Sequence, residues 1–138
     1  MRVDYQDGTG TGNILWRMGN QGDFALNNVN NDRWPWFSHQ HEAGIEANGD
    51  LTVFDNGNTP VAQLGGGCGP NDCDSRGMSL QFNESTMRVT PILSDDLGGY
   101  SVALGSAQLL NQQLLLLIGF HQYFVRASYR DFPDDGHD

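Results

Sequence analysis

Lysine is absent from this sequence, and arginine supplies all seven of its permanently charged basic side chains. Seventeen aspartate and glutamate residues outnumber these arginines, so the formal net charge is −10 over 138 residues. Binding to nucleic acid or to an anionic membrane surface requires clustered cations rather than a repulsive field. The composition therefore argues against nucleic acid and membrane as partners.

Long hydrophobic runs are also missing. The longest one, residues 114–120, is far too short to cross a membrane as a helix. The N-terminal residues lack the apolar core of a signal peptide. The sequence therefore shows neither a membrane span nor an export signal.

Cysteine is scarce: Cys68 and Cys73 lie close together in a loop of glycine, proline and asparagine. A disulfide between them would indicate an oxidising compartment. The spacing is equally compatible with two free thiols, so both alternatives stay open.

Glycine and asparagine are abundant, which favours turns and strands over long helices. Turn pairs such as Asn48-Gly49 and Gly98-Gly99 separate short runs of strand-forming residues. The expected strands are residues 13–18, 37–47, 51–54, 78–82, 87–93, 100–110, 114–120 and 123–129. This pattern predicts an all-β fold built from consecutive antiparallel hairpins.

Internal repeats divide these strands into groups. The segment that begins at Phe37 recurs at Tyr100. At the same spacing, the apolar positions of residues 51–54 recur in residues 114–117. One period, residues 37–93, holds four expected strands, which is the pattern of a β-propeller blade.

We therefore expect about two four-stranded antiparallel blades of an incomplete propeller. Residues 1–18 are the outer strands of one blade, 37–93 a whole blade, 100–129 most of the next, and 130–138 an acidic tail. Propellers close with typically four to eight blades, so two blades leave sheet faces uncovered. The sequence predicts either a fragment of a longer protein or self-association of open blades.

The most unusual chemistry lies in the segment that contains His39 and His41. Histidines two residues apart on a strand point to the same face, so we expect both to line one surface. Imidazole suits metal ligation, proton transfer and nucleophilic attack near neutral pH. This pair is the first candidate for a functional site.

A series of short motifs surrounds these histidines. They are ILWRMG at 14–19 followed by DF at 23–24, QHEA at 40–43, NGDLTVFDNGN at 48–58, SRG at 75–77, TMRVT at 86–90 and the segment YS…LGSAQ at 100–108. In this order and spacing they resemble the aryl-sulfate sulfotransferases, six-bladed propeller enzymes that do not use the nucleotide sulfate donor.

The resemblance implies transfer of a sulfuryl group from a phenolic sulfate ester to a phenol acceptor, through a transiently sulfated histidine and without a cofactor or metal. His41, in the QH motif, is the expected catalytic histidine. Asn56, Asn58 and His39 are expected substrate contacts. The resemblance also implies a periplasmic or secreted protein.

The sequence departs from the family pattern at Pro60, because an arginine over the sulfate commonly follows FDNGN. Losing such a charge-assisted contact costs about 1.5–3 kcal/mol. Arg76 is the candidate substrate-binding residue in its place, although nothing in the sequence puts it in the funnel. The usual NGN after GSAQ is also altered, at residues 111–113. We expect an incomplete active site, and this chain alone could be inactive.

Two readings from other classes remain. A non-catalytic propeller that binds a ligand or a protein agrees with the change at Pro60. A cupin-like metal-binding domain would use His39, His41 and Glu46, but the glycines expected around that motif and the second histidine motif are missing.

Overall fold

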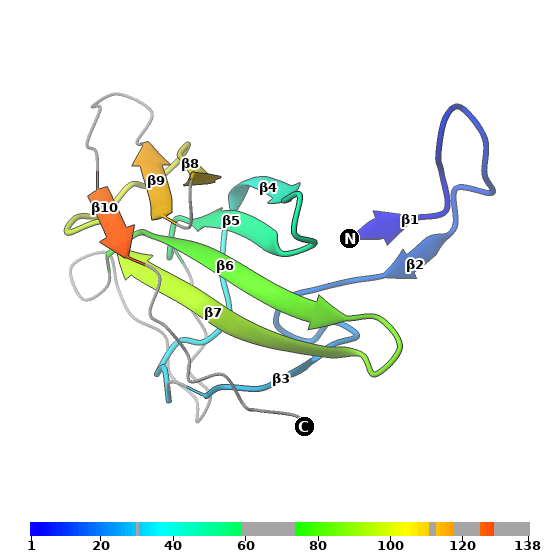
Figure 1. The fold of residues 1–138 in the computed structure, drawn as a ribbon, viewed down its shortest axis with the longest axis horizontal. Helices are drawn as coiled ribbons and strands as arrows, with labels where there is room; N and C mark the ends of the chain where they lie inside the picture. Colours follow the sequence, from blue (N-terminus) through cyan, green and yellow to red (C-terminus); the bar gives the residue numbers. More distant parts are fainter. Residues whose placement is uncertain (30, 59–73, 111–112, 118–124, 129–138) are drawn as a thin grey trace, which may run out of the picture.

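The computed structural model describes residues 1–29, 31–58, 74–110, 113–117 and 125–128 (Figure 1). Their regular structure consists of strands, and none of them lies in a helix that could cross a membrane. The strands are β1 (Arg2–Val3), β2 (Ile14–Trp16), β3 (Ala25–Leu26), β4 (His41–Ile45), β5 (Leu51–Asp55), β6 (Arg76–Asn83), β7 (Arg88–Asp96), β8 (Ser106–Leu110), β9 (Gln113–Leu117) and β10 (Val125–Ser128). The all-β prediction is confirmed for the described residues.

The main sheet has the order β3-β7-β6-β5-β4. Strands β4 to β7 are antiparallel and pair with their neighbours in sequence, as expected for residues 37–93. Strand β3 was not predicted; it runs parallel to β7, with Ala25 opposite Arg88 and Leu26 opposite Val89. A two-residue strand is too short to show an alternating pattern in sequence.

Two predicted strands begin later than expected. The strand expected over 37–47 is β4 alone, because the backbone bends before it and His39 has a positive φ of 50°. The strand expected over 100–110 is β8 alone, because Leu104 and Gly105 also have positive φ values. A left-handed residue interrupts an extended ladder, and alternation of side chains does not reveal it.

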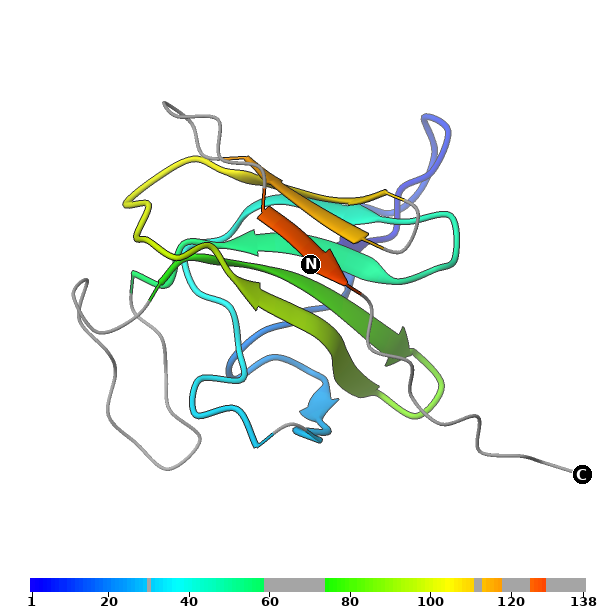
Figure 2. The ribbon, with the colours of Figure 1, turned by 60° about the vertical axis from the view of Figure 1, so that its left-hand side comes forward.

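A second sheet, β10-β9-β8, is stacked on the main sheet (Figure 2). Side chains from both sheets form the first core cluster, which contains Phe54, Leu93, Leu97 and Ala107. The β1–β2 hairpin forms a two-stranded sheet and projects away from the stacked sheets (Figure 1).

The opposite face of the main sheet carries the second core cluster. Successive residues of a strand point to opposite faces, so Val53 joins this cluster while Phe54 joins the first. Trp16 closes the cluster with edge-to-face contacts to Phe24 and Phe82, whose ring centroids lie 5.2 and 5.7 Å away. The buried members are Trp16, Phe24, Val53, Met78, Leu80 and Val89. These contacts attach β2 and the segment after it to the main sheet.

Gly105, directly before β8 in the LGSAQ motif, packs against Phe54 of β5. A Cβ atom at this position would lie 2.3 Å from Cε1 of Phe54, and the backbone has a φ of +146°. Both the contact and the conformation therefore require glycine. The fully buried ring of Phe54 packs directly over the glycine backbone.

We predict that Gly105→Ala lowers the free energy of unfolding by about 2–4 kcal/mol, because it adds a steric clash to backbone strain. Gly98→Ala is the matched control, since Gly98 has a φ of +74° but open space around it. The control should cost about 1–2 kcal/mol. Urea denaturation compares the two; an equal loss in both variants would contradict the close packing on Phe54.

Candidate functional site

Four of the five predicted site residues lie at one end of the main sheet, where β4 and β6 begin and β5 and β7 end (Figure 1). His41 is opposite Phe54 in the ladder, and Arg76 is opposite Asp55. Asn56 and Asn58 directly follow β5. Antiparallel pairing therefore brings together the QHEA, FDNGN and SRG motifs.

Arg76 is the centre of this end of the sheet. Its side chain is only 9% exposed. Its acceptors are Asp55 Oδ2 (2.9 Å), Asp32 Oδ2 (2.5 Å), Ser94 Oγ (3.3 Å), the carbonyl of Trp34 and the carbonyl of Trp36 (3.4 Å). All three guanidinium nitrogens thus donate to the protein itself, so binding a sulfate here would require breaking some of these bonds.

Two opposing effects act on the Arg76 guanidinium. Burial alone would lower the pKa of Arg76, whereas the charges and hydrogen bonds of Asp55 and Asp32 raise it, and the net shift is upward. The guanidinium therefore stays charged at neutral pH. Removing either the cation or its carboxylate partners would leave an uncompensated buried charge, which strongly destabilises a folded protein.

Asp55, the partner of Arg76, also binds the backbone that precedes the histidines. Its Oδ1 accepts hydrogen bonds from the N–H of Ser38 (2.8 Å) and the N–H of Gly57 (2.9 Å). Arg76 holds the carbonyls of Trp34 and Trp36 from the other side. Together, Asp55 and Arg76 fix residues 32–38 against the sheet, directly before His39 and His41.

Asn56 and Asn58 attach the loop between β7 and β8 to the main sheet. The amide nitrogen of Asn56 donates to the carbonyls of Ser101 (2.8 Å) and Leu104 (3.0 Å), and that of Asn58 donates to the carbonyl of Val102 (2.8 Å). A sulfuryl oxygen would need a hydrogen-bond donor, and the amide nitrogens of Asn56 and Asn58 already donate to these carbonyls. The Oδ1 atoms of both side chains, in contrast, are buried and have no hydrogen-bond partner among the described residues.

Ser75, which sequence reasoning missed, adds to the contacts between the end of β5 and the loop between β7 and β8. These contacts and those of Arg76 and Asp55 are together the joint at this end of the main sheet. The hydroxyl of Ser75 donates to the carbonyl of Asn56 (2.8 Å) and accepts from the N–H of Ser101 (2.8 Å). Its own N–H donates to the carbonyl of Gly99 (2.9 Å). The SRG motif could have indicated it, because the serine stands next to the buried arginine in sequence.

His41 differs from these buried residues. It is half-buried at the first position of β4, and among the described residues no hydrogen bond to its imidazole is found. The ladder between β4 and β5 is irregular from His41 to Gly44, and Glu42 has a positive φ of 46°. The imidazole of His41 thus combines partial exposure with unused hydrogen-bonding capacity.

His39 lies outside β4, so the expectation that both histidines share one face of a strand is wrong. Its backbone has a φ of 50°, which breaks the alternation, and its side chain is exposed. His39 instead lines a shallow pocket of about 410 Å³ with Trp36, Phe37, Ser38 and Gln40 among its walls. His41 is not part of that pocket.

The metal-binding alternative receives no support from the geometry. Within the described ranges, no group of three His, Cys, Asp or Glu side chains is placed to hold a metal ion. Glu46 accepts a hydrogen bond from the hydroxyl of Thr52 at 2.8 Å.

The departure from the family pattern at Pro60 and the two cysteines, Cys68 and Cys73, lie outside the described residues.

Asp96, opposite Arg76 in the ladder, makes this end of the sheet acidic. Partial burial raises the pKa of Asp96, Arg76 lowers it, and the nearby carboxylates of Asp74, Asp32 and Asp55 raise it again, with a net upward shift. The ionised form of Asp96 is therefore less favourable in the folded chain than in the unfolded chain.

Because the Arg76 cluster is buried, we predict that Arg76→Met lowers the free energy of unfolding by about 3–5 kcal/mol, since it leaves Asp55 and Asp32 without their cation. Arg88→Met is the control, because Arg88 is exposed at the start of β7. This control should change stability by about 0.5 kcal/mol or less. Similar losses in the two variants, measured by urea denaturation, would contradict the central role of Arg76.

We also predict that Asp96→Asn stabilises the chain at pH 7. The pKa of Asp96 in the folded chain lies above its ordinary value of 3.8, so ionised Asp96 lowers the free energy of unfolding. This loss of stability is complete above the raised pKa and disappears as the pH falls to 3.8 and below. The gain in melting temperature should therefore vanish in acid. Asp7→Asn, on an exposed turn, controls for net charge; an equal gain in that variant at pH 7 would contradict a local effect.

Comparison with protein-family models gives a match over residues 2–131, to the family described as arylsulfotransferase (ASST). The match includes every described strand and all five predicted site residues. Comparison with curated proteins gives no match.

Proposed function

The chain belongs to the arylsulfotransferase family, and from this premise we propose that it takes part in transferring a sulfuryl group from a phenolic sulfate ester to a phenol, with His41 contacting the sulfuryl group. The supporting observation is the half-buried imidazole of His41 at the start of β4, beside the segment fixed by Arg76 and Asp55. A rigid support next to a side chain with free hydrogen-bonding capacity is what a reacting group requires.

The proposed reaction has two steps. In the first, a histidine nitrogen attacks sulfur, the bond between sulfur and the phenolic oxygen breaks, and the leaving phenolate takes up a proton. In the second, the acceptor phenol loses its proton as its oxygen attacks sulfur, and the histidine is released. A neutral imidazole can attack or donate a hydrogen bond to the sulfuryl oxygens, so either role of His41 fits this scheme.

We further propose that this chemistry belongs to a larger propeller. Residues 1–18 would supply the outer strands of one blade, residues 37–93 a whole blade and residues 100–129 most of the next, and the remaining blades would complete the funnel around His41. The expected location is the periplasm or the outside of the cell. Under this proposal Asn56, Asn58 and Arg76 act chiefly as supports of the site, and His39 as a wall of it.

A non-catalytic binding role is the second candidate, and one observation favours it. Every nitrogen of the Arg76 guanidinium already donates to a protein acceptor, and Asp32, Asp55 and Asp96 surround it. With Pro60 in place of the arginine of the family pattern, Arg76 offers no free donor to a sulfate ester.

The two candidates predict different results when the complete protein is incubated with 4-nitrophenyl sulfate and a phenol acceptor. The enzyme should release 4-nitrophenol, and His41→Ala should lower the rate by about 10²–10³-fold, the usual loss when a transition-state contact is removed. His137→Ala makes the same substitution in the expected acidic tail and should keep full activity. Release of the phenol at an undiminished rate from the His41→Ala variant would eliminate the role of His41, and no release from the unaltered protein would favour the binding module.

A further inference from the structure

The turn that joins β4 to β5, residues 46–50, carries the Asn48-Gly49 pair at its exposed tip. The N–H of Gly49 donates to the carbonyl of Glu46 (2.9 Å), and the N–H of Glu46 donates to the carbonyl of Asp50 (2.8 Å). Gly49 has a φ of +90°, and beyond its chain neighbours no atom lies within 4 Å of the place that a Cβ would take. No side chain therefore hinders an approach to the peptide nitrogen of Gly49.

The side-chain amide of Asn48 is folded forward onto Asp50. Its Oδ1 accepts from the N–H of Asp50 (3.1 Å), and its Nδ2 donates to Oδ2 of Asp50 (2.7 Å). Because both contacts are with the residue after Gly49, they hold the amide carbon of Asn48 along the Gly49 backbone. The N–H of Asp50 also stabilises negative charge that develops on Oδ1. This placement favours attack of the Gly49 nitrogen on Cγ of Asn48.

A second Asn-Gly pair, Asn56-Gly57, has the same two residues in the opposite surroundings. Asn56 is fully buried. Its Nδ2 donates to the carbonyls of Ser101 and Leu104, so the side chain is directed away from Gly57. The N–H of Gly57 donates to Oδ1 of Asp55 at 2.9 Å. The two pairs thus share one intrinsic chemistry, and the fold exposes it at one position and blocks it at the other.

We propose that Asn48 is a site of spontaneous covalent modification that loosens the β4–β5 turn, while Asn56 keeps its amide. The nitrogen of Gly49 loses its proton to water and attacks Cγ of Asn48. The bond between Cγ and Nδ2 then breaks, and the amide takes up a proton and leaves as ammonia. Water opens the resulting succinimide ring at either of its two carbonyls, which leaves aspartate or isoaspartate at position 48. This inference does not rest on the proposed sulfuryl transfer.

The product places an oxygen where Asp50 now has a donor. Asp50 is only 6% exposed, so the new carboxylate faces one that is held out of water. Burial raises the pKa of Asp50, the hydrogen bond from Asn48 lowers it and the charge of Glu46 raises it, with a net upward shift. Modification removes the contact that lowers this pKa, and isoaspartate also lengthens the backbone of the turn by one carbon. Both changes weaken the turn.

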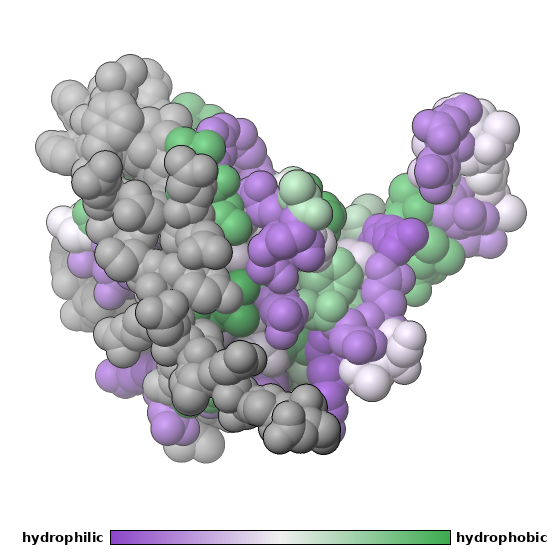
Figure 3. All heavy atoms as spheres, viewed as in Figure 1, coloured by the Kyte–Doolittle hydropathy of each residue, from purple (hydrophilic) through white to green (hydrophobic). Residues whose placement is uncertain are grey.

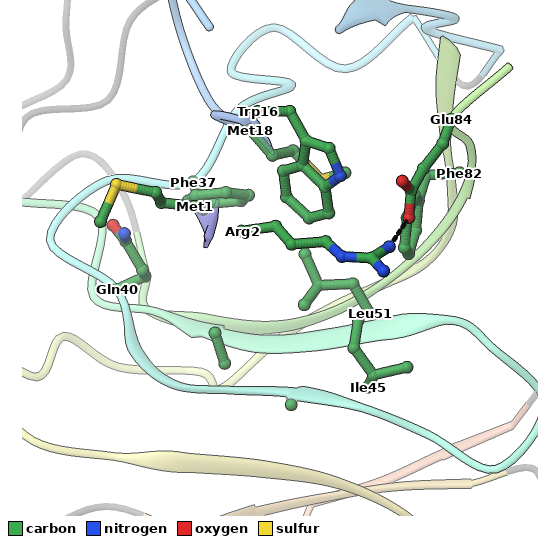
Figure 4. A pocket seen from close by; sticks show the side chains of 12 residues that line it. Met1, Arg2, Trp16, Met18, Phe37, Gln40, Ile45, Leu51, Phe82 and Glu84 are labelled. Carbon is green, nitrogen blue, oxygen red and sulfur yellow. Dashed lines mark hydrogen bonds and ion pairs between the residues drawn. The ribbon is translucent and has the colours of Figure 1, made fainter. Parts of the chain in front are cut away.

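The turn supports one wall of a pocket of about 550 Å³ beside the β1–β2 hairpin. Ile45 and Leu51 are the ladder pair next to the turn, and both line this pocket (Figure 4). In the space-filling view, apolar surface is visible at the base of the hairpin (Figure 3). A weakened turn therefore loosens the pairing of Ile45 with Leu51 and the pocket wall that they form.

The test compares the two Asn-Gly pairs within one molecule. The full chain is incubated at neutral pH and cleaved after arginine, which releases residues 34–76 with both pairs. Fragment-ion masses should show an amide becoming an acid at Asn48, and an isoaspartate-specific methyltransferase should label the same position. Asn56 should react about 10²-fold more slowly, because its two amide hydrogen bonds must open first and each opposes opening about tenfold.

The chain unfolded in guanidinium chloride is the matched control, because unfolding removes the surroundings that distinguish the two pairs. There Asn48 and Asn56 should react at similar rates. Equal rates in the folded chain would overturn the proposal. So would an Asn48 that keeps its amide in the folded chain over a period that converts it in the unfolded chain.

Asn48→Asp tests the effect on the turn separately. It should speed hydrogen exchange at the amides of Glu46 and Gly49 about fivefold, as expected when one hydrogen bond is lost. Asn13→Asp is the control, because Asn13 is exposed and its side chain has no hydrogen-bond partner in the described part of the chain. The control adds the same charge and should leave both amides unchanged. Equal exchange in the two variants would overturn the loosening of the turn.

Discussion

The buried ion pair between Arg76 and Asp55 is the interaction on which the arrangement of this protein depends. It sits at the end of the main sheet where four strands begin or finish. Arg76 also binds Asp32 and the carbonyls of Trp34 and Trp36, and Asp55 also binds the N–H of Ser38. One cation therefore joins the sheet to a segment 40 to 44 residues earlier in the chain, because a buried charge is costly without its partners.

The sequence motifs of the family acquire a physical meaning in this structure. FDNGN supplies the buried ring that Gly105 packs against, the carboxylate that pairs with Arg76, and the amides that hold the loop before β8. SRG supplies the cation and the serine that bridges Asn56 to Ser101. These motifs thus join the main sheet to the loop that leads into the second sheet, and the histidine of QHEA lies beside the joint.

The sequence predicted the strands of the main sheet because alternating apolar residues and Asn-Gly turns mark them directly. It did not predict β3, which has only two residues, or the left-handed backbone at His39, which places that side chain outside the strand. The partners of Arg76 were also out of reach, because Asp32 and Trp34 are distant in sequence and only the folded chain brings them together. Arg76 was therefore predicted to bind sulfate, whereas in the structure its guanidinium pairs with Asp32 and Asp55.

Hydrogen exchange in the unaltered chain tests most directly whether this buried joint organises the site. The amides of Ser38, Gly57 and Ser101 lie outside the strands, and their acceptors are the side chains of Asp55 and Ser75. If the joint is as rigid as its burial indicates, these three amides exchange as slowly as those in the middle of β5 and β6. Exchange at the rate of an unprotected loop would contradict the account.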